Sequence, residues 1–175
     1  MSEKEIQVVP YNANWSVEYK KEAARIVPLL KPILRAIHHI GSTSIPNMAA
    51  KPTIDILAEV TTIEMCDSFT NEFVKIDYQP FGEYGIKNRR YFVKKDRFGN
   101  HLVHLHAFET ESEQVIRHLA FRDYLKTHEE TARFYCQLKL QLAKEFPNDR
   151  EGYCIGKDEA CKRIEQLALH WWYEG

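Results

Sequence analysis

The pattern of apolar and polar positions begins with a helical period. Apolar residues recur every three or four positions from Trp15 to Ile37, which is typical of a helix that buries one stripe. Asn14 is expected to cap this helix, while Pro28 and Pro32 should kink or interrupt it. The pattern then predicts a short strand, which ends in the segment 39–41.

Residues 53–60 alternate strictly between two sets of positions, which is the period of a β-strand. One face of this predicted strand is apolar and consists of Ile54, Ile56, Ala58 and Val60. The opposite face is formed by Thr53, Asp55, Leu57 and Glu59. One face is therefore expected to meet the core, and the other to carry chemistry or face solvent.

Weaker patterns follow up to residue 108. A second helix is predicted over 62–76, followed by a loop over 78–88 that is rich in Gly and Tyr. Strands are predicted over 90–94 and 101–108, and the short loop between them is a hairpin signal.

The last third of the chain contains helix signals only. Thr110 and Thr127 each precede a glutamate by three positions, so both are predicted to begin helices as capping boxes. Asn148 or Asp149 should cap the final helix. Together the patterns predict an α/β (α+β) fold with an all-helical C-terminal third.

The length and charge of the chain limit the number of domains and the kinds of partner that it is expected to have. The chain has 175 residues and a formal net charge of -1, which fits one domain over residues 1–175 and gives no strong nucleic-acid signal. No apolar run approaches the roughly 20 residues that span a bilayer, so no membrane partner is expected. The polar residues 1–5 do not resemble a secretory signal, and a cytoplasmic location is predicted. The four cysteines contain no CxxC pair, so a structural zinc knuckle is not expected. Because no export signal is predicted, the cysteines are expected to be reduced and structural.

The strongest chemical signal joins the end of one predicted strand to the next. Gly41 lets a phosphate approach the backbone, and the hydroxyl groups of Ser42, Thr43 and Ser44 can donate to phosphate oxygens. Asp55 could hold a divalent metal between the phosphates, because hard cations prefer oxygen ligands. On spacing alone, a turn with capping hydroxyl groups followed by a strand with one exposed acid explains the same residues.

A family resemblance favours the phosphate interpretation. The segment 39–56, HIGSTSIPNMAAKPTIDI, resembles the signature of the GrpB family, and further similar stretches cover nearly the whole chain. This family is usually placed in the DNA polymerase beta-like nucleotidyltransferase superfamily, and a similar module is fused to dephospho-CoA kinase in some bacteria. The resemblance implies a nucleotidyltransferase-like fold, in which helices flank a mixed β-sheet. It also implies a phosphate-binding turn at Gly41 and Ser42 and a metal-binding acid at Asp55.

One position departs from the superfamily pattern. Active members usually carry a second carboxylate two residues after the first, and here that position is Leu57. Glu59, on the same face, is a substitute candidate or a solvated charge at the strand end. Because two-metal sites need several bridging carboxylates, ordinary two-metal nucleotidyl transfer is in doubt.

Other side chains offer alternatives. His104 and His106 share one face of a predicted strand, so together with Asp55 they could bind a transition metal, bind phosphate or act as an acid–base pair. Two hydrogen-bonded histidines on a half-buried face are the competing interpretation. Lys51 and Arg90 are predicted to neutralise phosphate charge, ahead of the further basic candidates Arg89 and Lys157.

The leading expectation is a nucleotide-binding protein, with Mg²⁺, or else Mn²⁺ or Zn²⁺, as cofactor. Such a protein would transfer a nucleotidyl or phosphoryl group to an acceptor that the sequence does not identify. The first alternative is a non-catalytic module that binds a nucleotide-like small molecule or a protein partner. The second is a metal-dependent hydrolase that uses His104, His106 and Asp55.

Overall fold

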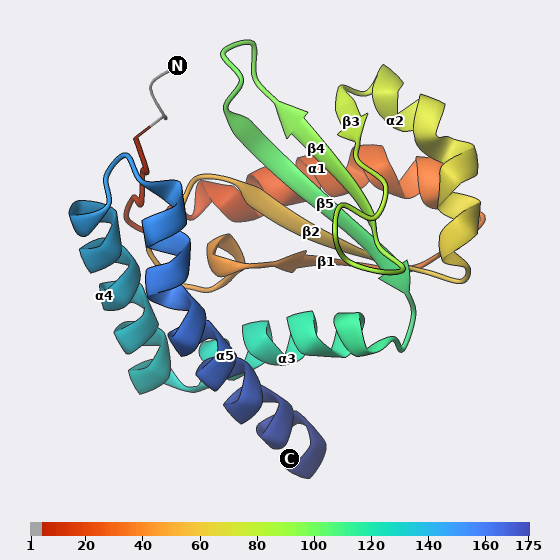
Figure 1. Ribbon diagram of the computed structural model, residues 1–175. Coiled ribbons are helices and arrows are strands. Elements are labelled where there is room, and N and C mark those ends of the chain that lie inside the picture. The colour runs from red at the N-terminus through yellow and green to blue at the C-terminus, as the bar shows by residue number, and fades with distance from the viewer. Residues whose placement is uncertain (1–4) are drawn as a thin grey trace.

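A computed structural model describes residues 5–175 as a five-stranded mixed sheet with helices on both faces (Figure 1). Residues 1–4, which include most of the polar N-terminal segment discussed above, lie outside the described residues. The elements in chain order are α1 (Asn14–Leu30), β1 (Leu34–Ile40), the 3-10 turn η1 (Ser42–Ser44), β2 (Ile54–Val60), the 3-10 helix η2 (Ile63–Phe69), α2 (Thr70–Lys75), β3 (Tyr78–Pro80), β4 (Arg90–Lys95), β5 (His101–Glu109), α3 (Glu113–Thr127), α4 (Glu129–Glu145) and α5 (Arg150–Glu174).

The sheet brings together strands that are far apart in the sequence. Its order is β1-β2-β5-β4-β3, in which β2 and β5 run parallel and all other neighbours are antiparallel. Asp55 lies opposite His104 across the parallel pair and opposite Ile40 across the antiparallel pair. This register places the acid of β2 beside both the histidine strand and the end of β1.

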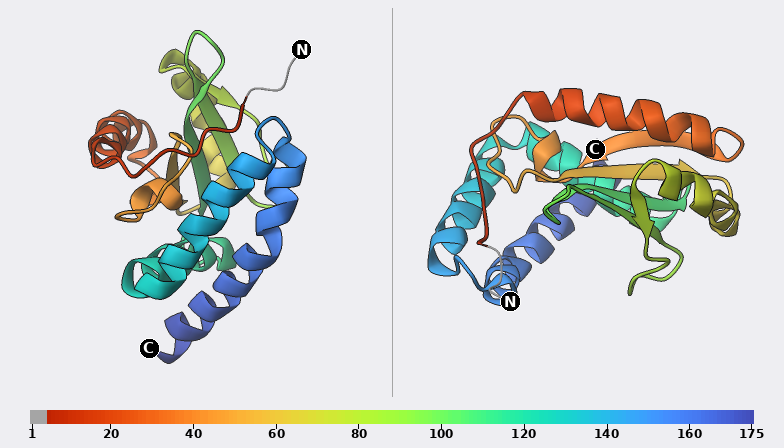
Figure 2. Two further views of the ribbon diagram at one scale, coloured as in Figure 1. Left: turned by 90° about the vertical axis from the view of Figure 1, so that its left-hand side faces the viewer. Right: turned by 90° about the horizontal axis from the view of Figure 1, so that it is seen from above.

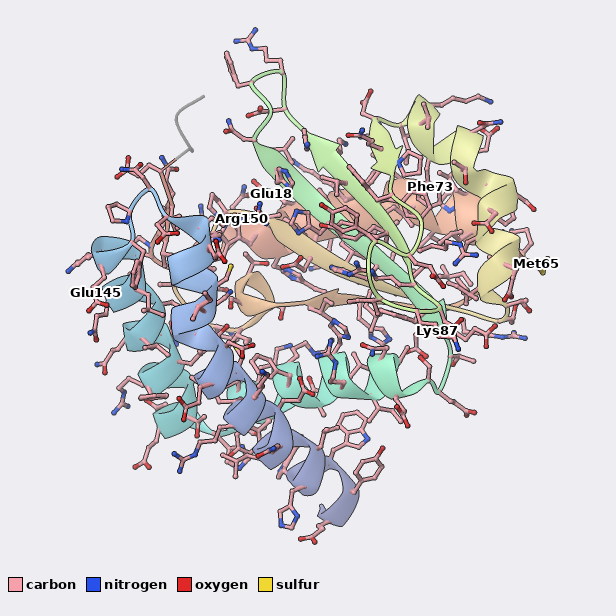
Figure 3. The ribbon with its side chains drawn as sticks, viewed as in Figure 1. Glu18, Met65, Phe73, Lys87, Glu145 and Arg150 are labelled. Atoms are coloured by element: carbon pink, nitrogen blue, oxygen red, sulfur yellow. The ribbon has the colours of Figure 1, made fainter. Side chains whose placement is uncertain are left out.

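One face of the sheet packs against α1 and α2, which cover the side away from the C-terminal helices (Figures 1 and 2). The predicted apolar face of β2 lies in this core, together with Ile26, Phe73 and Leu105. Phe73 of α2, labelled in Figure 3, stacks on Phe92 of β4 with the ring centroids 4.4 Å apart. The alternation in the sequence therefore identified the buried side of this strand.

The other face meets the C-terminal helices. Leu57 is fully buried there, in a small cluster with Ile40, Phe108 and Val115 of α3. A separate cluster joins α3, α4 and α5 and includes Ile45 and Met48 from the segment after η1. The helical third thus closes over the strand face that carries Asp55, and the region between them is the place for a site.

The first predicted helix was too long. It ends at Leu30, and the residues that continued its apolar stripe belong to a turn (Ile33) and to β1 (Ile37). Pro28 stays inside the helix. Asn14 is the first helical residue rather than the cap, and its backbone N–H donates to Oδ1 of Asn12 at 2.9 Å.

The two predicted capping boxes were also wrong. Ser112 caps α3, because its side chain accepts from the N–H of Val115, while the Thr110 hydroxyl donates to Glu59. Thr127 is the last residue of α3, and its hydroxyl donates to carbonyl groups of the preceding turn. Asp149 does cap α5, as predicted, by accepting from the N–H of Gly152 at 2.8 Å.

The coarse prediction of the fold class is confirmed. The structure has the expected mixed sheet, flanking helices and all-helical C-terminal third. The predicted loop over 78–88 contains the short strand β3, and the predicted helix over 62–76 consists of η2 and α2. In residues 5–175, no helix has the length and apolar character needed to cross a membrane.

Candidate functional site

Gly41 turns the chain directly beside Asp55. Its φ is +72°, in the left-handed region that favours glycine. A Cβ atom at this position would lie 2.6 Å from Oδ2 of Asp55, so a side chain cannot fit without a shift. The glycine thus allows the end of β1 to lie directly beside the Asp55 carboxylate.

Asp55 is the centre of a histidine network. Its Oδ1 lies 3.3 Å from Nδ1 of His104 and 3.7 Å from Nε2 of His106. The other nitrogen of His104, Nε2, lies 2.7 Å from Nδ1 of His101. The predicted grouping of Asp55 with the two histidines of β5 is therefore present, because the parallel register aligns the strands.

The network favours the charged form of the acid. Burial by itself would raise the pKa of the Asp55 carboxyl group, but hydrogen bonds and electrostatic attraction from His104 and His106 outweigh it. The pKa of Asp55 therefore lies well below its ordinary value. Near neutral pH the group is a carboxylate and an acceptor of hydrogen bonds.

The three hydroxyl groups after Gly41 have different partners. The Thr43 hydroxyl lies 2.9 Å from Nε2 of His39, and Ser44 Oγ donates to the Gly41 carbonyl at 2.6 Å. Ser42 Oγ instead lies 2.8 Å from Nζ of Lys139, on α4. Of these three residues, Ser42 is therefore the one whose hydroxyl group contacts a lysine.

Lys139 was absent from the sequence-based candidates. It is 3% exposed, and its ammonium group also donates to the carbonyl of Ala49. Burial lowers the pKa of Lys139 to about 7, and the positive charge of Lys157 acts in the same direction. A lysine close to half-protonation at neutral pH is unusual, and such values are common at functional sites.

Two further lysines lie near the same turn. The Nζ atoms of Lys51 and Lys157 lie 4.5 and 5.1 Å from the ring centroid of Tyr153. Burial lowers the pKa of Lys51, and repulsion from Lys157 and from Arg150, at the first turn of α5 in Figure 3, lowers it further. Within residues 5–175, Lys51, Lys139 and Lys157 form no ion pair with a carboxylate.

Two cavities meet at Asp55. The smaller has a volume of about 140 Å³ and is lined by Ser42 and the three lysines just described, among others. The larger has a volume of about 300 Å³ and lies against α3 and α5, where Phe121 and the ion pair Arg117–Glu165 line it. Asp55 contributes to both cavities, so a ligand in either one can reach its carboxylate.

The two arginines that precede and begin β4 have separate roles. Arg90, a predicted phosphate ligand, binds Asp67 of η2 with both Nε and Nη2, at 2.6 and 3.0 Å. Its neighbour Tyr91 points to the opposite face and contacts the rings of His104 and His106. Arg89 lies on this second face, with Nη1 3.4 Å from Nδ1 of His106. The structure thus brings Arg89, rather than Arg90, to the histidine network.

The acid candidates do not form a two-metal centre. Glu59 is engaged at the far end of β2, with His38 Nε2 at 2.6 Å and the Thr110 hydroxyl at 2.8 Å. The position of the usual second carboxylate is the buried Leu57. Among residues 5–175, no three His, Cys, Asp or Glu side chains are arranged as metal ligands. Asp55 Oδ1 instead lies 3.3 Å from Nδ1 of His104 and 3.7 Å from Nε2 of His106, and Nε2 of His104 lies 2.7 Å from Nδ1 of His101.

Known sequences provide the context for this site. The model of the GrpB protein family matches residues 5–167. The UPF0157 protein YqkA of Bacillus subtilis is 43% identical over 168 residues, which is 96% of this chain and 48% of that protein. This chain therefore spans about half the length of that relative. The glutamate-rich protein GrpB of Alkalihalophilus pseudofirmus is 30% identical, over 91% of this chain and 94% of the relative.

A solved structure has the same fold. The crystal structure of the conserved protein GrpB from Enterococcus faecalis is 38% identical and superposes with a TM-score of 0.91. The match covers 96% of this chain and 100% of that one. The arrangement of sheet and C-terminal helices that encloses Asp55 is thus similar to that of a protein of known structure.

Proposed function

Because the chain belongs to the GrpB protein family, and because its basic residues gather at one turn, we propose that it binds a nucleotide through the phosphates. The proposal is for a protein of nucleotidyltransferase-like fold that acts in the cytoplasm. The phosphates occupy the small cavity beside Ser42, and the rest of the ligand extends toward Asp55.

One observation carries the proposal. The amino groups of Lys51, Lys139 and Lys157 converge on a single small cavity, and within residues 5–175 none of them has a carboxylate partner. Holding like charges together in a half-buried place is unfavourable unless an anion neutralises them. A polyphosphate supplies that anion with several acceptor oxygens, and lysine is a common phosphate ligand.

Each group of the cavity has a distinct part in this binding. Lys51 and Lys157, both beside the Tyr153 ring, hold the phosphate charge, and Ser42 lies against the phosphates in the same cavity. Thr43 and Ser44 shape the turn, since their hydroxyl groups are occupied by His39 and Gly41. Arg90 takes no part in this phosphate binding because its guanidinium group is paired with Asp67.

Transfer of a nucleotidyl or phosphoryl group is the activity that we propose for this site. Asp55 lies between the two cavities, so its carboxylate can accept a hydrogen bond from a hydroxyl group that enters the larger one, and can thereby orient it. The side chains do not fit a two-metal centre, because Leu57 replaces one carboxylate and Glu59 is engaged elsewhere. A requirement for a single divalent cation is a separate hypothesis, to be tested with Mg²⁺, Mn²⁺ and Zn²⁺.

The convergence of His104 and His106 on Asp55 supports a second candidate function. Two imidazoles and a carboxylate are a donor set that suits zinc or iron better than magnesium, so a metal-dependent hydrolase would use the same residues. Metal analysis of untagged protein separates the two candidates. Stoichiometric zinc or iron favours the hydrolase.

Thermal unfolding with a panel of nucleoside triphosphates and coenzyme A precursors tests the proposal. Each ligand is tried without metal and with each cation, on wild type and on Lys51→Met and Lys157→Met. A ligand at 100 times its dissociation constant stabilises the fold by about 2.7 kcal/mol, a shift of several degrees. We expect the shift with wild-type protein and a much smaller one with either variant.

Lys144→Met is the matched control, since Lys144 is exposed on α4. It removes the same charge from the chain without touching the cavity, so the shift should remain. If no nucleotide stabilises the wild-type protein under any metal condition, the proposal is wrong. A shift that Lys51→Met and Lys157→Met leave unchanged would place the ligand elsewhere.

A further inference from the structure

The contact between Ser42 and Lys139 is closer than phosphate binding requires. Oγ and Nζ are 2.8 Å apart, a normal hydrogen-bond distance, although 97 positions of sequence separate the residues. A lysine that only attracts phosphate needs no hydrogen bond to a serine. A lysine that takes a proton from a serine needs this one.

The surroundings of Lys139 suit a neutral amine. Such an amine has two N–H groups and one lone pair. The Ala49 carbonyl accepts one N–H group, and the ring of Tyr135, whose centroid lies 4.8 Å from Nζ, can receive the second. The lone pair is then free to accept the hydroxyl hydrogen of Ser42. Both N–H donors and the lone pair of a neutral Lys139 amine therefore have hydrogen-bond partners in the structure.

Neighbouring groups act on the protonation of this amine from two helices. Tyr135 and Cys136 belong to its own helix α4, and Lys157 and Cys161 extend from α5. Burial and Lys157 disfavour the ammonium form, whereas the two cysteines favour it, with a net pKa of about 7. The same cavity also contains the titratable groups of Lys51, Asp55, His104 and Tyr153.

Ser42 also has the location of a reacting group. It follows the left-handed Gly41, lines the small cavity and lies in the turn that adjoins Asp55. Lys51 and Lys157 line the same cavity, so an electrophile that enters it meets two cations besides the serine. Phosphoryl groups match this environment better than neutral esters because they carry the complementary charge.

We propose that Ser42 is a nucleophile that accepts a phosphoryl group, with Lys139 as its general base. The inference rests on the proposed phosphate binding and names the reaction that follows it. The substrate class is a phosphoanhydride or an acyl phosphate, whose leaving group departs as an anion and needs no proton.

Phosphoryl transfer to Ser42 conserves atoms, protons and charge. Ser42 Oγ attacks phosphorus, its proton passes to Nζ of Lys139, and the bond from phosphorus to the leaving oxygen breaks. The products are phosphoserine, a lysine ammonium group and the leaving anion, which Lys51 and Lys157 attract. When water later attacks the phosphoserine, Lys139 returns its proton to Oγ, and both hydrogens of the water remain with the phosphate.

This chemistry also fits the departure at Leu57. A second carboxylate serves a two-metal centre that activates the attacking oxygen, and this chain has a buried leucine there. A serine that is paired with a neutral amine is activated without that carboxylate. The attacking oxygen then belongs to the protein rather than to the acceptor.

The test is acid-quenched mass spectrometry of the intact protein after incubation with acetyl phosphate or with ATP, followed by peptide mapping. Phosphoserine survives acid, whereas phosphohistidine and phospholysine do not, so the quench removes products formed on His104 or on a lysine. We expect one phosphoryl group on Ser42. Ser42→Ala should abolish it, and Ser68→Ala, an exposed serine of η2, should retain it.

Two variants of Lys139 separate a base from a simple cation. Lys139→Arg keeps the positive charge but cannot accept a proton, so phosphorylation should slow by about 100-fold or more. Lys139→Met should do the same, while Lys144→Met should not. In wild-type protein the rate should rise with pH through an ionisation near pH 7, and in Lys139→Arg this dependence should be lost.

The outcomes are separable from those of the proposed function. Nucleotide stabilisation without phosphoserine overturns the inference and leaves nucleotide binding standing. Absence of both overturns both. A wild-type rate that falls with rising pH, or a rate that Lys139→Arg retains, shows that Lys139 is only a cation. If the Lys139 variants do not fold, the pH profile of wild type and the loss in Ser42→Ala decide the matter.

Discussion

Replacing Lys139 by methionine removes an amine that the fold shields from water almost completely, at 3% exposure. The substitution leaves Ser42 Oγ and the Ala49 carbonyl without their hydrogen-bond partner, which costs about 1–3 kcal/mol at any pH. It also removes a titration that makes the stability of the wild-type protein depend on pH. That second effect is the sharper test, because it has a predictable sign.

Burial lowers the pKa of Lys139 from 10.5 to about 7 in the folded protein. Between these two values the unfolded chain holds a proton that the native state has lost, so the free energy of unfolding rises with pH. Below pH 7 Lys139 is protonated in both the native and the unfolded state. The native state is then destabilised by the full cost of burying the charged ammonium group. Each pKa unit corresponds to about 1.4 kcal/mol, so wild type should gain about 2 kcal/mol over Lys139→Met between pH 7 and pH 9.

Urea unfolding at pH 7, 8 and 9 measures this difference for wild type, Lys139→Met and the control Lys144→Met. Other groups with shifted pKa values, such as Cys66, are common to all three proteins and cancel in the comparison. Parallel stability curves for wild type and Lys139→Met would refute the account of a buried lysine whose pKa is lowered to about 7. Lys144→Met should follow wild type throughout.

Three further substitutions test the surroundings of the site in urea titrations. Gly41→Ala should cost about 1–3 kcal/mol, because its φ is left-handed and a Cβ atom would meet Asp55; an unchanged midpoint would contradict this. His118→Gln should reduce the loss of stability on acidification, by about 2 kcal/mol between pH 6.5 and pH 5. The reason is that burial lowers the pKa of His118 to about 4, so the unfolded chain gains the proton first; an unchanged acid slope would oppose this. Leu57→Asp should destabilise the fold by about 3–5 kcal/mol, since it buries an unpaired charge, and a neutral effect would show that the position is open to solvent.

Sequence periodicity correctly predicted the strands that form the site. It failed at positions where the same residue pattern is compatible with two kinds of local structure. The strict alternation of β2 identified its buried face, and the hairpin signal located β4 and β5. Ile33 and Ile37 fit a helical stripe and also a turn and strand, so the first helix was extended too far. Thr110 and Thr127 have the spacing of helix caps, but their hydroxyl groups bind Glu59 and backbone carbonyls.

The site was predicted only in part, because its basic groups come from distant helices. The grouping of Asp55 with His104 and His106 followed from two strand patterns, and the parallel register brought them together. Lys139 lies on α4 between Tyr135 and Leu142, at the spacing of one buried helix face. A lysine on a buried helix face indicates that it has a polar partner. The partners here, Ser42 and the Ala49 carbonyl, are set by tertiary packing and could not be read from the sequence.

Arg90 lies apart from the histidine network. It was predicted to be a phosphate ligand, but neighbouring residues of a strand point to opposite faces. Arg90 therefore binds Asp67, while Arg89, in the loop just before the strand, reaches His106. Which of two adjacent arginines meets the site is decided by strand register, and a single sequence does not reveal that.

The central claim is that a nucleotide polyphosphate binds among Lys51, Lys139 and Lys157. Calorimetric titration of ATP into wild type and into the double variant Lys51→Met/Lys157→Met tests it most directly. The account predicts saturable binding to wild type, and an affinity at least about 100-fold weaker in the double variant, since each hydrogen bond to a charged group contributes about 1.5–3 kcal/mol. Equal affinities for the two proteins, or no binding to wild type, would contradict it.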